Sequence, residues 1–178
     1  TITADAIETI NASVLAGSVA VSAGLVGAAA SGAGATLENR VGTQVKSYIA
    51  NSTGTHIDAD GNITIAAHDT STISALAGAS SVAASVGVVA DSVSIGLSVA
   101  VNNIDNTVEA YVSSSTVDSV SGNMSVEAIE NATITATSIA SSAATSAGIF
   151  SSAVSGGGAL ATNTINTQTR AHVTQSTL

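Results

Sequence analysis

Three copies of one sequence pattern constrain the fold of this chain more than any other feature. The segment Asn-Arg-Val-Gly-Thr-Gln-Val-Lys-Ser-Tyr-Ile begins at Asn39 and returns in altered form at Asn102 and at Asn163, with spacings of 63 and 61 residues. A fixed period with drifting residue identity indicates a repeat architecture. In such an architecture each unit buries its apolar face against its neighbours rather than in one closed globule.

The repeat register divides the chain into three units, 1–62, 63–123 and 124–178, of which the last is truncated. Together they are expected to form one continuous segment. The first unit has two additional residues between Thr53 and Gly61, and we expect them in a surface loop. The chain begins with threonine and stops inside a unit, so it is interpreted as an excerpt of a longer chain or as a processed filament subunit.

Composition excludes several classes of partner. Only 8% of the residues are charged, and three basic residues cannot supply the many Lys and Arg contacts that nucleic acid requires. The uncharged runs are diluted by Ser, Thr, Asn and Gly, so membrane insertion is not expected. Without cysteine there is no disulfide or thiolate metal site. A net charge of -9 with abundant Ser, Thr and Asn favours an extracellular or cell-surface location.

The hydrophobic periodicity favours strands. Between 92 and 101, Val, Ile and Leu alternate with Ser, Gly and Ala, a period of two that places one set inward and the other outward. Val19, Val21, Ala23 and Leu25 repeat this alternation in the first unit. Because β-branched residues dominate these segments and most helix-favouring residues are scarce, the chain is predicted to be mostly β.

Among all-β architectures, a right-handed parallel β-helix, or β-solenoid, built from three repeats of about 61 residues fits best. A propeller needs units of about 40 to 50 residues and aromatic anchors, and immunoglobulin-like sandwiches need units near 100 residues. A solenoid interior filled with Val, Ile, Leu and Ala suits the composition. If each unit winds as three coils of about 20 residues, the segment is a rod about 40 Å long.

The segments Ala100-Val101-Asn102-Asn103-Ile104 and Val108-Glu109-Ala110-Tyr111-Val112 carry a family resemblance. They resemble repeats of filamentous haemagglutinin-like and leukotoxin-type adhesins, which are very large bacterial surface and secreted proteins. The third unit departs from the pattern at His172, where the others have Tyr48 and Tyr111. The resemblance implies a right-handed β-helix used as a cell-surface stalk or adhesive fibre.

One segment offers oxygen ligands for a metal ion. Asp58, Asp60 and Asn62 stand at alternate positions, as in calcium loops. A tight Asp-Gly-Asn turn explains the same residues without a metal. The second unit is aligned with Ser119 and Ser121 at the positions of the two aspartates. Calcium is therefore the one candidate cofactor, and this enlarged segment is the first place to look for a site.

Catalytic residues are not evident, and no enzyme is predicted. The acidic residues are spread along the chain and are expected to be exposed charges that keep the rod soluble. Glu8 and Glu130 fall near each other in the repeat, aligned one residue out of register. Six further positions are interpreted as structural because they recur in register. The asparagines are expected where a coil bends, and these positions are Asn39, Asn102, Asn163, Tyr48, Tyr111 and His172.

Two classes of function remain. The first is a non-catalytic stalk or fibre segment of an extracellular repeat protein involved in adhesion or assembly. Its partners would be neighbouring repeats or copies of itself, joined end to end through exposed strand edges. The alternative is a binding module that recognises a glycan or a host surface through an exposed ladder of Ser, Thr and Asn.

Overall fold

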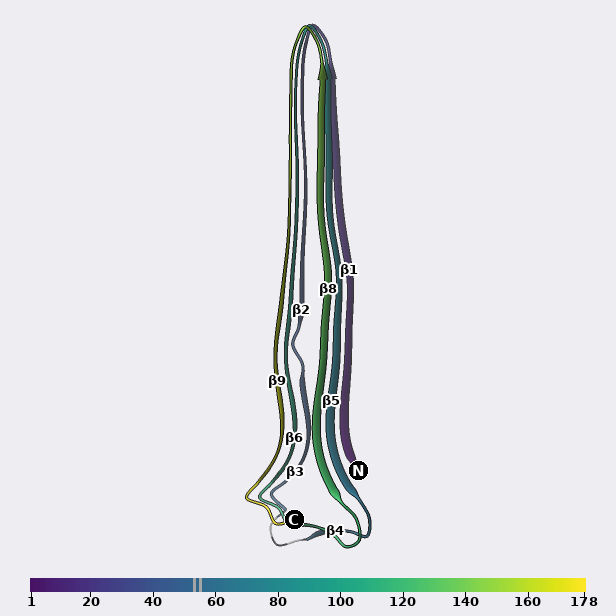
Figure 1. Ribbon diagram of the computed structural model, residues 1–178, viewed down its shortest axis with the longest axis vertical. Helices are drawn as coiled ribbons and strands as arrows, with labels where there is room; N and C mark the ends of the chain where they lie inside the picture. Colours follow the sequence, from purple (N-terminus) through teal and green to yellow (C-terminus); the bar gives the residue numbers. More distant parts are fainter. Residues whose placement is uncertain (53, 55) are drawn as a thin grey trace.

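The computed structural model describes residues 1–52, 54 and 56–178, so Thr53 and Thr55 of the enlarged segment lie outside the described residues. Most of the described part is β-strand and none of it is helix, which confirms the predicted all-β class. Two layers of long strands lie face to face along the molecule, and a short third sheet lies at one end (Figure 1). The described residues contain no helix that is long and apolar enough to cross a membrane.

Every sheet is parallel. The first contains, in spatial order, β1 (Ile2–Ala23), β5 (Ile63–Val86) and β8 (Met124–Ala147). The second is centred on β6 (Val89–Ser113), with β2 (Val26–Val41) and β3 (Gln44–Ala50) on one side and β9 (Phe150–Thr174) on the other. The third pairs β4 (Ile57–Ala59) with β7 (Val117–Ser119).

Strand register follows the sequence repeat. Ile10 lies beside Ile73, which lies beside Ile134 on its other side. The second sheet aligns the repeated asparagines and aromatic positions in the same way. Spacings of 63 and 61 residues therefore put equivalent side chains of successive units next to each other, at the strand separation of about 4.8 Å.

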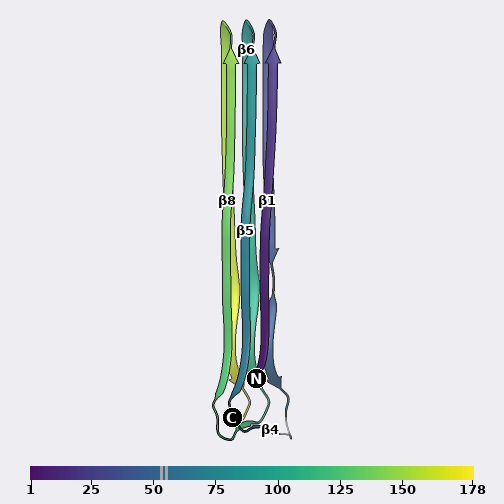
Figure 2. The ribbon, with the colours of Figure 1, turned by 90° about the vertical axis from the view of Figure 1, so that its right-hand side faces the viewer.

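Each unit makes one circuit rather than the three predicted. The chain runs along the first sheet, turns, returns along the second sheet, passes the third sheet and then enters the next unit. Figure 2 shows the three units side by side, one strand wide each. The long axis therefore follows strands of up to 25 residues, about 80 Å at 3.3 Å per residue. The predicted rod of about 40 Å along the stacking direction is wrong.

A two-residue glycine turn joins the layers in every unit. The glycines are Gly24, Gly87 and Gly148, each followed by an aliphatic residue. A Cβ atom on Gly87 would lie 2.5 Å from the carbonyl oxygen of Gly24, and one on Gly148 would lie 2.5 Å from that of Gly87. Because the turns of the second and third units stack on the backbone of the preceding turn, a side chain has no room at Gly87 or Gly148. The strands thus run uninterrupted to one common end.

The residue types that fill the interior change along the length of the strands. Near the third sheet it is aliphatic, as predicted, with Ile65, Val108 and Val112 fully buried. Near the glycine turns small residues fill it, and the hydroxyl oxygens of Ser81 and Ser94 are 2.7 Å apart between the two layers. The prediction that Val, Ile and Leu fill the interior is wrong in this half.

Close approach of the two layers explains why small residues, rather than large aliphatic ones, fill the interior here. A Cβ atom on Gly96 of β6 would lie only 2.6 Å from the carbonyl oxygen of Ser141 in β8. In the half of β6 near the glycine turn the aliphatic side chains therefore face outward, and Ile95 and Leu97 are 50% and 56% exposed. Tight packing of the layers leaves space only for Ser, Ala and Gly between them.

Candidate functional site

The repeated asparagines form a ladder inside the second sheet. The amide Nδ2 of Asn39 donates to Oδ1 of Asn102 at 2.7 Å, and Nδ2 of Asn102 donates to Oδ1 of Asn163 at 2.8 Å. Asn102 has no exposed surface. Because stacked amides are separated by one strand spacing, each can serve both as donor and as acceptor. The ladder carries a hydrogen bond from unit to unit in one direction.

The prediction that these asparagines lie at bends is wrong, because all three lie within long strands. The left-handed backbone expected at a bend occurs twelve residues later in each unit, at Asn51, Ser114 and Gln175, with φ between 48° and 58°. A period-two strand can hold an asparagine on its inner face when a neighbouring unit supplies the partner.

Aromatic rings form a second ladder on the outer face of the same sheet. The ring centroids of Tyr48 and Tyr111 are 5.0 Å apart, and those of Tyr111 and His172 are 5.3 Å apart, with nearly parallel planes. His172 therefore continues the stack in place of a tyrosine. Two residues before these rings, Glu109 pairs with Lys46 at 3.0 Å and with Arg170 at 3.7 Å, again across all three units.

Both sides of the stack are open edges in the described part of the chain. β1, β2 and β3 pair only with the second unit, and β8 and β9 pair only with it from the other side. The ladders consequently stop at Asn39 and Tyr48 on one edge and at Asn163 and His172 on the other. Each edge presents unpaired backbone groups that can accept another parallel strand.

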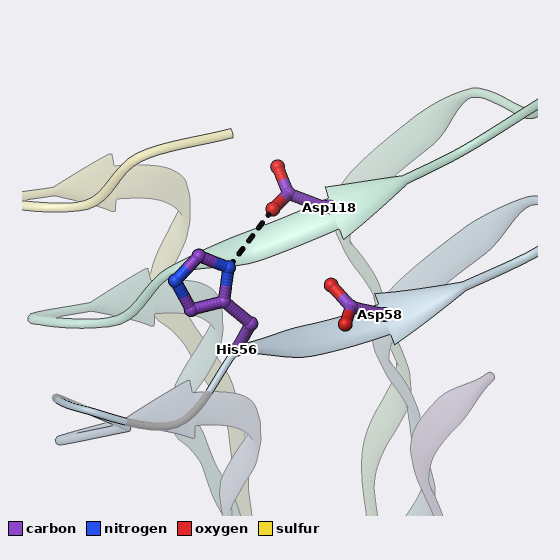
Figure 3. Close-up of side chains that lie close together, drawn as sticks. All are labelled: His56, Asp58 and Asp118. Carbon is purple, nitrogen blue, oxygen red and sulfur yellow. Dashed lines mark ion pairs between the residues drawn. The ribbon is translucent and has the colours of Figure 1, made fainter.

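Of the three predicted calcium ligands, Asp60 and Asn62 contact the second unit through hydrogen bonds. Asp60 accepts a hydrogen bond at its backbone carbonyl from the Ser121 hydroxyl. The Oδ1 atom of Asn62 accepts one from the backbone N–H of Asn123 at 2.8 Å. Asp58 instead joins a different group of side chains, with His56 and Asp118, whose ligand atoms lie within 4.8 Å of one another (Figure 3).

A change of register creates this group. The pairing offset is 63 residues at Ala50 and Ser113, falls to 60 at Ile57 and Val117, and returns to 61 at Ile63. The first unit thus has three additional residues before β4 and one fewer after it, which gives the predicted net excess of two. Asp58 pairs with Asp118 rather than with Ser119, so the predicted alignment was wrong by one residue.

A second cluster of carboxyl groups lies between the two layers. The Ser71 hydroxyl donates to Oδ2 of Asp69 at 2.8 Å and lies 3.2 Å from Oε2 of Glu8. From the opposite sheet, Nδ2 of Asn106 lies 2.7 Å from Oδ2 of Asp69 and 3.1 Å from Oε1 of Glu130. Asp69 has no exposed surface, so the prediction that the acids are exposed is wrong here.

This carboxyl cluster holds protons more tightly than isolated carboxyl groups do. Burial raises the pKa of Glu130 from 4.5 to about 7; the hydrogen bond from Asn106 opposes this rise, whereas the Asp69 carboxylate adds to it. Burial and contact with Asp69 likewise raise the pKa of Glu8. The Oδ1 atom of Asp69 is buried and receives no hydrogen bond from the described residues.

Sequence reasoning missed this cluster through an error of register. Glu8 pairs with Ser71, and Glu130 pairs with Asp69, so the two glutamates are two repeat positions apart rather than one. Two positions correspond to the same face of a strand, whereas one position corresponds to opposite faces. The period-two alternation of the strands was the sequence signal that could have placed Glu8 and Glu130 on the same face.

A shallow apolar hollow of about 450 Å³ lies on the outer face of the first sheet. Leu15, Leu76 and Ile139 line it, and Gly78 leaves space between them. Two serines are its polar contribution, and no titratable group lines it. No titratable group in the lining could act as an acid or base, or activate either serine as a nucleophile.

No family model, curated protein or solved structure matches the chain.

Proposed function

We propose that this chain is a segment of a right-handed parallel β-helix that serves as a non-catalytic stalk or fibre of an extracellular or cell-surface repeat protein. Its contribution is length and stiffness in adhesion or assembly. The partners are neighbouring repeats, or copies of the chain joined end to end. The resemblance to filamentous haemagglutinin-like and leukotoxin-type adhesins agrees with this role.

The carrying observation is that the ladders run through all three units and end at open edges. At one edge the Oδ1 atom of Asn163 accepts a hydrogen bond from Asn102. The Nδ2 group of Asn163 lies on the other side of the same amide and can donate to a following unit. At the other edge Asn39 has donated to Asn102 and retains an acceptor oxygen. A following unit in register would join this donor to this acceptor.

The path of the chain supports the β-helix. The three units visit the sheets in the same order, and the pairing between units is parallel throughout. Crossovers between parallel strands are almost always right-handed. Stacked parallel units whose outer strands remain unpaired extend by adding further units, which is the behaviour that a stalk requires.

End-to-end association of the isolated chain tests the proposal. Light scattering and sedimentation velocity over a range of protein concentrations are expected to detect linear assemblies. Because every chain carries a net charge of -9, association should strengthen as salt screens the repulsion. A species that remains monomeric at high concentration and high salt would refute extension through open edges.

A matched pair of variants distinguishes loss of pairing at the open edge from loss of folding. In Asn163→Asp the side chain keeps an acceptor for Asn102 but loses the donor that faces the next unit. Assembly should weaken about 10- to 100-fold, the effect of one buried hydrogen bond of about 1–3 kcal/mol, while the monomer stays folded. Thr164→Asp adds the same charge on the exposed outer face and serves as the control. Equal loss of assembly in both variants would contradict the ladder.

A glycan-binding module is the second candidate, and one outward row favours it. Thr9, Thr72 and Thr133 lie side by side on the first sheet, in register across the three units. Regularly spaced hydroxyl groups on a rigid sheet can align with a repeating saccharide. Specific retention of the folded chain on a glycan array, abolished by Thr72→Val, would favour this function over the stalk.

A further inference from the structure

The short third sheet brings together three side chains whose chemistry the stalk does not use. His56 directly precedes β4, Asp58 lies within β4, and Asp118 lies within β7 of the next unit. The three additional residues before β4 change the register there, so that His56 meets a carboxylate of the second unit. These additional residues belong to the first unit, which makes the arrangement local rather than repeated.

The three side chains converge on one point. Nδ1 of His56 lies 3.4 Å from Oδ2 of Asp118, and one ligand atom from each of the three residues lies within 4.8 Å of the others. Figure 3 shows the imidazole of His56 directed toward the carboxylate of Asp118, with the carboxylate of Asp58 on the neighbouring strand. The side chains of His56 and Asp118 are 64% and 46% exposed, so both can adjust to a ligand and water can reach them.

Two aspartates paired directly across parallel strands repel each other. Asp58 and Asp118 are in register in the third sheet, and like charges at facing positions destabilise a strand pair. A cation between them removes this repulsion. The imidazole next to them supplies a nitrogen ligand, which distinguishes this group from an ordinary exposed pair of acids.

We propose that His56, Asp58 and Asp118 form a binding site for a divalent transition-metal ion of the Zn²⁺ type that joins the first two units. Imidazole and carboxylate ligands at about 2.0–2.2 Å suit Zn²⁺. Bringing ligand atoms from 4.8 Å apart to the separations of a tetrahedral site requires only rotation of exposed side chains. Water completes the coordination, since the chain supplies three ligands.

Calcium fits this group less well than zinc. Ca²⁺ takes six to eight oxygen ligands, whereas one of the three ligands here is a nitrogen. The oxygen of Asn62 is already bonded to the backbone of Asn123. Asp60, which the sequence pattern placed in a calcium loop, is not part of the cluster. The proposed site therefore differs in ligand set and in ion from the calcium loop that the sequence pattern predicts.

Isothermal titration of the chain with ZnCl₂ at pH 7.5 tests the site. One Zn²⁺ per chain is expected to bind saturably, and binding should persist in 1 mM CaCl₂. Loss of one direct ligand in His56→Ala or in Asp118→Asn should weaken binding at least 10-fold. Because the imidazole must be neutral to bind the metal, lowering the pH to 5.5 should also weaken it.

Two control variants locate the ion. Asp60→Asn removes the neighbouring aspartate that lies outside the cluster, and His172→Ala removes an exposed histidine of the aromatic ladder. Both are expected to bind Zn²⁺ as the unmodified chain does, and circular dichroism verifies that every variant is folded. Absence of saturable binding, binding that survives both ligand substitutions, or equal losses in the two controls would each overturn the proposal.

Discussion

Replacing Glu130 with glutamine tests whether the buried carboxyl cluster holds a proton at neutral pH. Glutamine has the shape of the protonated glutamic acid, can still accept the hydrogen bond from Asn106, and can donate one to Asp69. Glu130→Gln therefore fixes the cluster in a state that resembles its protonated form. The unmodified chain must instead release a proton as the pH rises.

The sign and size follow from the pKa of Glu130. In the unfolded chain the pKa is 4.5, and in the folded chain it is about 7. The folded state thus binds more protons between these two values, and its stability falls as pH rises through this window. At about 1.4 kcal/mol for each tenfold difference in proton affinity, the upper bound is about 3–4 kcal/mol. Because Glu130 is only partly buried on an edge strand, screening by solvent lowers the expected loss to about 1–3 kcal/mol.

Urea denaturation followed by circular dichroism at pH 5, 6.5 and 8 measures this effect. The unmodified chain should lose about 1–3 kcal/mol of unfolding free energy between pH 5 and pH 8. Glu130→Gln should be more stable than the unmodified chain at pH 8 by a similar amount and nearly equal to it at pH 5. A smaller dependence on pH remains in the variant because the pKa of Glu8 is also raised.

Glu127→Gln is the matched control, since Glu127 lies on the same strand, carries the same charge and is exposed. It should change the stability equally at all three pH values and by less than about 0.5 kcal/mol. Stability of the unmodified chain that stays constant or increases from pH 5 to pH 8 would refute the reasoning. A stabilisation by Glu127→Gln as large as that by Glu130→Gln would refute it as well, because net charge would then explain both.

Two further predictions concern the packing of the units. Gly87→Ala places a Cβ atom 2.5 Å from the Gly24 carbonyl oxygen and should destabilise the chain by about 1–3 kcal/mol in urea denaturation. The control Gly34→Ala, whose Cβ atom would have nothing within 4 Å, should be neutral or stabilise by up to about 1 kcal/mol. Equal effects of the two substitutions would contradict the close approach at the turn. Asn102→Ala leaves the buried amide donor of Asn39 without its acceptor, so calorimetry should detect a loss of about 1–3 kcal/mol. An unchanged melting temperature would exclude the ladder as a source of stability.

Repeat register was the part of the fold most accessible from sequence. Equivalent residues such as Ile10, Ile73 and Ile134 became strand neighbours because parallel stacking of identical units puts like beside like. The recurrence of Tyr48 and Tyr111 placed their rings side by side in the same way, although the sequence was not used to predict a stack, and His172 continues it because imidazole is also planar.

The contacts of the two polar clusters were less accessible, for two different reasons. Asn106 reaches Asp69 and Glu130 from the opposite sheet, and a comparison of repeats contains no information about which residues face each other across the layers. His56 meets Asp118 only because the offset between units changes locally to 60 residues. A single constant spacing, assumed along the whole unit, misaligned that segment.

The sequence by itself determined that the chain is all-β and that its units pair in register, because both properties follow from local alternation and from repetition. Only the tertiary structure decided that a unit makes one circuit and that Ile95 and Leu97 face outward. An alternation of period two is compatible with either face being buried. The choice depends on the distance between the layers, and at Gly96 that distance admits only the smallest side chains.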